Sequence, residues 1–205
     1  MNIQQLWRRI AMAGAALSVL AAMTGCVSAG HFVDGNLKEV EASHFAKTDP
    51  VHPVQLLFEF QTKGVENARA TSALRSRVAD QVAASGIFDK VSDTPVPGGA
   101  LLTITFNNVP LTDGAAAKGF ATGLTLGLAG TAVTDGYIAT AHYTAPGQST
   151  PITKEVRHAI HTTIGNHAPP PNAVAVASAE EAVNQMLHQT VSHLLDDVSH
   201  DAAFK

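Results

Sequence analysis

The residue with the most distinctive chemistry in this sequence is Cys26, because it is the only cysteine in a chain of 205 residues. A single thiol cannot form an intramolecular disulfide, so its role has to be inferred from its neighbours. The first nine residues are basic and carry no acid, and an apolar, alanine-rich run follows them up to Met23. Thr24 and Gly25 then offer small side chains to a peptidase. This order predicts a secretory signal peptide over residues 1–25.

The sequence Met23-Thr24-Gly25-Cys26 resembles the lipobox of bacterial lipoproteins, in which a small residue precedes the cysteine that is lipidated. The resemblance implies that Cys26 carries diacylglycerol and a further acyl chain such as palmitate. Each buried CH₂ contributes roughly 0.8 kcal/mol, so several chains hold a protein firmly. Val27, rather than Asp, follows the cysteine. By the sorting rule of such lipoproteins in enteric bacteria, this implies a lipid anchor in the outer membrane, with the domain facing the periplasm.

Two alternatives to lipidation start from the same residues. One is an ordinary cleaved signal peptide that a chance cysteine follows. The other is a transmembrane anchor, but the apolar run is short for the ~20 residues that a helix needs to cross a bilayer. The small residues at its end also favour cleavage.

No other residues form a recognisable catalytic set, since the chain contains no GxSxG, HExxH or Walker motif. We therefore predict no enzyme activity, no catalytic residue and no cofactor. Histidine is frequent, with ten in the chain, and His193, Asp197 and His200 fall near one face of the last predicted helix. With Asp201 they could bind a metal ion. A solvated helix end explains them as well, and no metal site is predicted.

Two further histidines, His158 and His161, lie three residues apart on a predicted strand. Side chains at that spacing point to opposite faces of a sheet, so the pair cannot chelate one ion. His158 has apolar neighbours, and we interpret it as a core histidine with satisfied hydrogen bonds.

Charge excludes one class of partner. Cleavage after Gly25 removes Arg8 and Arg9, which leaves eleven basic against 17 acidic residues and a net charge of −6 with histidine counted as neutral. An acidic protein has no electrostatic footprint for nucleic acid, so no nucleic-acid partner is predicted. The arginines of the first predicted helix, Arg69 and Arg77 among them, are interpreted as a solvated face.

Hydrophobic periodicity predicts the elements of a folded domain. Apolar and polar residues alternate over residues 54–60, 100–106 and 136–143, which predicts three strands. A short apolar run predicts another strand over residues 87–91. Residues 155–164 fit both a strand and a helix stripe, and their β-branched content favours a strand.

Two helices are predicted from local signals at their ends. Asn67 is suited to cap a helix that runs to about Ser85, where Gly86 follows as its C-terminal glycine. Ser178 and Glu181 form a capping box at the start of a second helix, which extends towards the C-terminus. Both helices carry one apolar stripe.

We therefore expect a signal peptide over residues 1–25, a lipidated cysteine with a flexible tether over residues 26–53, and a single α+β domain over residues 54–205. The predicted order is strand, helix, two strands, a glycine-rich insert, two strands and helix. It suggests a mostly antiparallel sheet of about five strands with two helices on one face. A loop is expected over residues 165–176, where three prolines stand together.

This element order, over roughly residues 54–198, resembles the periplasmic domains of several bacterial lipoproteins. These are the transport-auxiliary lipoproteins, the penicillin-binding-protein activators and the curli-secretion lipoprotein. The resemblance implies a non-enzymatic module whose partner is a peptidoglycan synthase, a lipid-transport complex or an assembly machine.

The glycine-rich insert over residues 114–134 is the most unusual stretch of the chain. Its glycines recur at near-helical spacing, and residues 119–134 carry no charge. On a helix such glycines form a smooth face that another backbone can approach closely. The residues predicted to form this partner or self-association surface are Gly119, Gly123, Gly127 and Gly130.

Three interpretations of the insert remain open: internal packing on the sheet, an interface with a partner or a second copy, and insertion into the membrane. The favoured function is a lipid-anchored outer-membrane lipoprotein that binds or scaffolds a periplasmic protein partner without catalysis. The first alternative is an oligomer that inserts residues 119–134 into the membrane, and the second is an enzyme or metal-binding protein.

Overall fold

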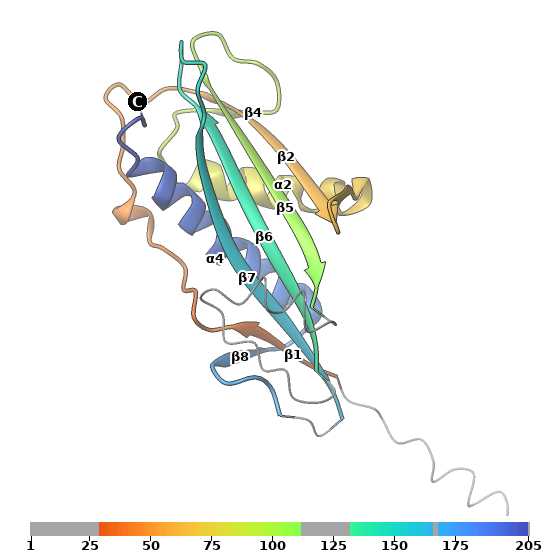
Figure 1. Ribbon diagram of the computed structural model, residues 1–205. Helices are drawn as coiled ribbons and strands as arrows, with labels where there is room; N and C mark the ends of the chain where they lie inside the picture. The colour runs from red at the N-terminus through yellow and green to blue at the C-terminus, as the bar shows by residue number, and fades with distance from the viewer. Residues whose placement is uncertain (1–28, 112–131, 166–167, 205) are drawn as a thin grey trace, which may run out of the picture.

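The computed structural model describes residues 29–111, 132–165 and 168–204. Together they form an α+β fold in which two helices pack on an open sheet (Figure 1). In chain order the elements are β1 (Ala29–Asp34), the 3₁₀ turn η2 (Ala42–His44), β2 (Val54–Thr62), β3 (Val65–Glu66), α2 (Ala68–Ala84), β4 (Val91–Ser92), β5 (Ala100–Pro110), β6 (Ala132–Thr144), β7 (Ile152–Ile164), β8 (Ala173–Val176) and α4 (Ala179–Ser199).

The sheet has eight strands in the order β3-β2-β5-β6-β7-β1-β8, with β4 paired beside β2. It is mixed: β2 runs parallel to β4 and β5, and the other pairs are antiparallel. The parallel pairing follows from α2, because a crossover helix between two strands returns the chain to the same end of the sheet. The prediction of about five mostly antiparallel strands is therefore wrong in number and partly wrong in direction. The prediction of an α+β class with two helices is confirmed.

Both helices cover the same face of the sheet, behind it in Figure 1, and neither crosses the front face. Leu74, Val78 and Val82 of α2 lie in one buried cluster with the apolar stripe of α4. From the sheet, β5 adds Leu102, Ile104 and Phe106, all fully buried, while Thr103 and Thr105 between them point to the other face. The alternation that predicted this strand is thus the alternation between its two faces.

The helix ends are those that the sequence predicts. The side chain of Asn67 accepts a hydrogen bond from Ala70 N at 3.0 Å, and Gly86 follows α2 with φ +67°. Ser178 Oγ accepts from Glu181 N at 3.1 Å at the start of α4. The carboxylate of Glu181 reaches back one residue further than in a standard capping box and accepts from Ala177 N at 2.9 Å.

Residues 29–53 belong to the folded domain, where the sequence analysis expected a tether. Strand β1 lies between β7 and β8, and Val33 and Phe45 are buried in the core. Ala29–Asp34 is short and has no sustained alternation, so only its pairing with two neighbours makes it a strand.

Two local predictions also need correction. The strand expected over residues 87–91 does not form: Ile87 and Phe88 are buried in an irregular segment, and only Val91 pairs, as part of β4. The loop expected over residues 165–176 ends in strand β8, which pairs with β1 at the edge of the sheet. Neither described helix is long and apolar enough to cross a bilayer.

Candidate functional site

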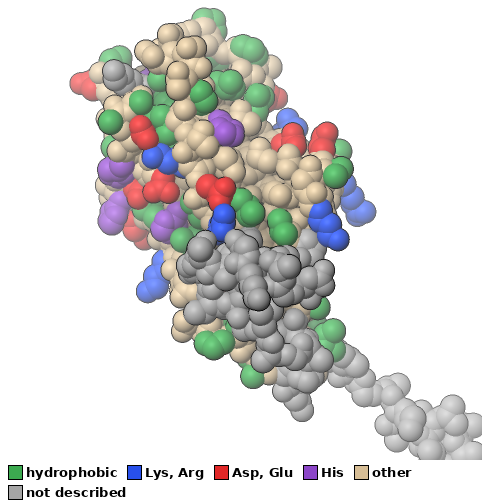
Figure 2. All heavy atoms as spheres, in the orientation of Figure 1, with side chains coloured by type: hydrophobic (Ala, Val, Ile, Leu, Met, Phe, Trp, Pro, Cys, Tyr) green, Lys and Arg blue, Asp and Glu red, His purple; other side chains and the backbone are tan. Residues whose placement is uncertain are grey.

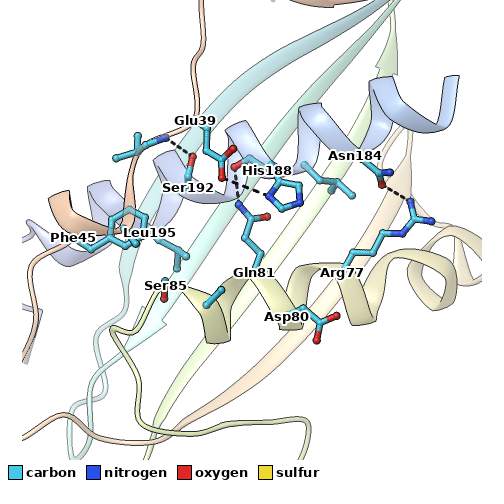
Figure 3. A pocket seen from close by; sticks show the side chains of 14 residues that line it. Glu39, Phe45, Arg77, Asp80, Gln81, Ser85, Asn184, His188, Ser192 and Leu195 are labelled. Carbon is cyan, nitrogen blue, oxygen red and sulfur yellow. Dashed lines mark hydrogen bonds and ion pairs between the residues drawn. The ribbon is translucent and has the colours of Figure 1, made fainter. Parts of the chain in front are cut away.

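A groove of about 560 Å³ runs between α2 and α4 on the outer side of the helix layer. One wall comes from α2 and the other from α4, and the segment before η2 closes one side (Figure 3). Leu187, Leu195 and Phe45 are almost completely buried and form its apolar floor. The rim is polar, with Asp80 and Gln81 from α2 among its members. Apolar floors with polar rims are characteristic of sites that bind other molecules.

Side-chain contacts hold the two helices at a fixed separation along the groove. Arg77 of α2 pairs with Glu180 at 2.8 Å and also donates to the side-chain oxygen of Asn184, both on α4. Gln81 Nε2 donates to the carbonyl of His188 at 2.7 Å. The ion pair is exposed, so it contributes only about 0–1 kcal/mol to stability. Its effect is to position the walls of the groove.

The segment Leu37–Phe45 is tied to α4 by contacts along its length. His193 Nε2 lies 2.7 Å from the carbonyl of Lys38, and Val40 N donates to Ser192 Oγ at 3.0 Å. His188 Nδ1 lies 3.6 Å from a carboxylate oxygen of Glu39 at the groove rim. This segment follows β1 directly, so the strand that the sequence did not predict also fixes the third wall of the groove.

The groove has no free nucleophile among its lining residues. Ser192 Oγ donates to the Gln189 carbonyl at 2.9 Å and accepts from Val40 N. Ser85 Oγ donates to the Val82 carbonyl at 2.6 Å. Both hydroxyls therefore donate to backbone carbonyls within their own helices. The arrangement is suited to binding by shape and polarity.

Sequence reasoning missed this groove. Arg77 lies on an exposed face, as predicted, and from there it also contacts α4 through Glu180 and Asn184. These contacts depend on two helices lying side by side, and no local sequence signal in either helix predicts them. The only available signal was the polar residues that flank both apolar stripes.

The predicted site residues Cys26, Gly119, Gly123, Gly127 and Gly130 lie outside the described residues. Their neighbours in the chain can be placed. Leu111 N donates to the Thr134 carbonyl at 2.9 Å, so the chain leaves β5 and enters β6 at the same end of the sheet. Ala29 is opposite Ile164 at that end too. Ala29, Leu111 and Ala132 therefore lie at the same end of the sheet.

The histidines that were considered as metal ligands have other partners. His193 contacts the Lys38 carbonyl, His200 pairs with Asp196 at 3.2 Å, and Asp201 pairs with Lys154 at 2.7 Å. Within residues 29–111, 132–165 and 168–204, no three His, Cys, Asp or Glu side chains converge as metal ligands.

His158 is a core histidine with satisfied hydrogen bonds, as predicted. Its Nδ1 accepts from Ala159 N at 2.8 Å, which places the ring proton on Nε2, and Nε2 donates to Gln189 Oε1 at 2.7 Å. Burial in this surrounding lowers the pKa of His158. A buried imidazole that is held neutral and hydrogen-bonded on both nitrogens fixes α4 on β7.

His161 points to the opposite face of β7, as its spacing from His158 predicts, and is also buried. Its Nδ1 lies 2.9 Å from Thr134 Oγ1 on the neighbouring strand. Burial lowers the pKa of His161, and the charge of Asp34 opposes that shift. The two histidines cannot share a ligand, because the sheet separates them.

No protein-family model matches the chain, and no curated protein matches it. Among solved structures, the rare lipoprotein B from Shewanella oneidensis is 13% identical with a TM-score of 0.39, and the alignment covers 71% of this chain and 92% of that one. The PelC dodecamer from Paraburkholderia phytofirmans is 11% identical with a TM-score of 0.35, covering 85% and 99%. At these values neither likeness assigns a family or an activity to this chain.

Proposed function

We propose that this chain is an outer-membrane lipoprotein, acylated at Cys26, whose α+β domain binds a cell-envelope protein without catalysis. The observation that carries the proposal is the sequence at the N-terminus: a basic start, an apolar run and Thr24-Gly25 before the only cysteine, a pattern that predicts a lipoprotein signal peptide. Acylation gives that cysteine a function in an exported protein, where a lone thiol is otherwise reactive. The domain starts only three residues later, at Ala29.

The groove between α2 and α4 supports the binding part of the proposal. Its apolar floor and polar rim match the composition of protein interfaces. The contacts of Arg77 and Gln81 with α4 hold the two helices in place before any partner binds. A preformed site loses less side-chain freedom on binding. The occupied hydroxyls of Ser85 and Ser192 favour a binding role over hydrolysis.

The anchor is tested with Cys26→Ser. We expect the variant to take up no labelled palmitate, and to remain unprocessed or to become a periplasmic protein that leaves the membrane fraction. Cys26→Ser protein that still incorporates the label would refute lipidation at this residue. Cys26→Ala serves as a second variant without a hydroxyl.

The groove is tested by in-cell crosslinking with a photoreactive residue at Asp80, which lines it. The control position is Arg75, which is exposed on the same helix and does not line the groove. We expect a discrete crosslinked adduct from position 80 and none from position 75, with mass spectrometry identifying an envelope protein. Adducts of equal yield at both positions, or none at position 80, contradict the assignment of the groove as the binding site.

A further inference from the structure

Three strands of the sheet end side by side, and this end of the sheet differs from the rest of the surface in its charge and in its exposed apolar side chains. We call it the sheet tip and define it as residues 29–31 of β1, 132–134 of β6 and 162–164 of β7. The strand register brings these residues together: Ala29 is opposite Ile164, and Ala132 is opposite Thr163. In Figure 1 the tip lies beside β8 at the lower end, opposite the C-terminus.

The sheet tip carries no Lys, Arg, Asp or Glu side chain, and its one histidine is His31. No Lys, Arg, Asp or Glu occurs in residues 27–33 or in residues 158–179, and residues 132–134 are uncharged as well. Asp34, the first acid after β1 begins, is buried. In Figure 2 the end of the molecule beside the grey chain shows hydrophobic and other uncharged atoms, whereas the acidic and basic side chains in view lie over the rest of the domain.

Branched aliphatic side chains are exposed at this end. Ile164 is 48% exposed and Val133 is 45% exposed, although both belong to strands whose alternate residues are buried. Ile164 shares its face of β7 with the buried Ile160, and Val133 shares its face of β6 with the buried Tyr137. The core pattern of both strands thus continues past the part of the sheet that the helices cover. Val174 of β8, opposite Val33, is also 48% exposed.

We propose that the sheet tip rests on the lipid surface that holds Cys26, with Ile164 and Val133 entering the interfacial layer. This inference rests on the proposed lipid anchor. Two residues separate Cys26 from Ala29, and an extended chain spans at most about 3.3–3.6 Å per residue step, so over three steps the tip stays within roughly 11 Å of the acylated residue.

The chemistry of the tip fits a bilayer surface. It brings no Lys, Arg, Asp or Glu side chain that would have to lose water on contact with lipid. The transfer of its exposed aliphatic groups from water to lipid is favourable in free energy. Contact between the domain and the membrane therefore needs no attraction between charges. A face that must remain solvated next to a membrane would instead be expected to carry the Lys, Asp and Glu residues that occupy the rest of this surface.

The test uses tryptophan as a depth probe. Trp7 is the only tryptophan in the chain and lies in the predicted signal peptide, so the mature protein contains none. Ile164→Trp places a single probe at the tip. Leu57→Trp is the matched control, because Leu57 is 41% exposed and lies opposite Thr103, in the half of the sheet away from the tip. Both variants, as the acylated mature protein that begins at Cys26, are reconstituted in vesicles of phosphatidylethanolamine and phosphatidylglycerol, with and without acyl-chain-brominated phosphatidylcholine.

We expect brominated lipid to quench Ile164→Trp and to leave Leu57→Trp unchanged. If both proteins float with the vesicles but Ile164→Trp is quenched no more than the control, the anchor stands and the inference is refuted. A blue-shifted Ile164→Trp spectrum without quenching would mean that protein, such as a second copy, covers the tip, which also refutes it. If the proteins do not float, the lipid anchor itself fails, and the inference falls with it.

Discussion

Truncation of Leu187 tests both the core and the floor of the groove. Leu187 lies in the stripe of α4, is 2% exposed and belongs to the main apolar cluster. Leu→Ala changes in cores cost about 2–5 kcal/mol. Because Leu187 also lines the groove, water can enter the space that truncation leaves, and we expect the lower part of that range, about 2–3 kcal/mol. For a domain of this size, each kcal/mol lowers Tm by about 2–4 °C, so the expected loss is roughly 4–12 °C.

Leu187→Asp should be more severe, since an unpaired buried carboxylate costs several kcal/mol and a whole domain is stable by only about 5–15 kcal/mol. We expect no cooperative unfolding transition. Leu57→Asp is the control, because Leu57 points away from the helices and is partly exposed, so its change should stay within about 0.5–1 kcal/mol. The assay is thermal unfolding followed by far-ultraviolet circular dichroism. A wild-type Tm for both Leu187 variants would refute the assignment of this stripe to the core.

Two further predictions concern stability. Burial lowers the pKa values of His158 and His161 in the folded protein, so the unfolded chain binds protons more readily below its ordinary histidine pKa of about 6.5. Stability should therefore be highest above that pH and fall as the pH is lowered through it, and a Tm that stays constant on acidification would contradict this. Ser178→Ala should cost about 1 kcal/mol, since it removes the cap of α4, whereas Ser76→Ala on exposed α2 should be neutral or slightly stabilising by chemical denaturation.

The helices and long strands were predictable because their signals are local. Asn67 and Gly86 mark the ends of α2, and Ser178 marks the start of α4, each through a contact within a few residues. The strands β5 and β6 alternate apolar and polar residues, because one of their faces meets the helices. Strand β7 is buried on both faces over residues 158–161, so its signal was β-branched content and not alternation. Long periodic segments of this kind determine their own structure.

The remaining strands were not predictable because their structure depends on their neighbours. Ala29–Asp34 and Ala173–Val176 are short and rich in small residues, and they become strands by pairing with each other and, for β1, with β7. The parallel direction of β5 depends on where α2 crosses the sheet. The groove escaped prediction for a related reason: the contact of Arg77 with Glu180 joins residues far apart in sequence.

The position of β1 changes what kind of partner the domain can reach. A flexible tether over residues 26–53 would let the domain move far from the bilayer, but the sheet begins at Ala29 and the link to Cys26 is at most about 11 Å long. On the helix face, His188 at the groove lies nine residues into α4, which corresponds to roughly 14 Å along the helix from Ala179. If the tip rests on lipid, the groove opens sideways within a few nanometres of the membrane surface. This geometry favours a partner that lies at the outer membrane or extends to it, and it disfavours one that the domain would have to meet deep in the periplasm.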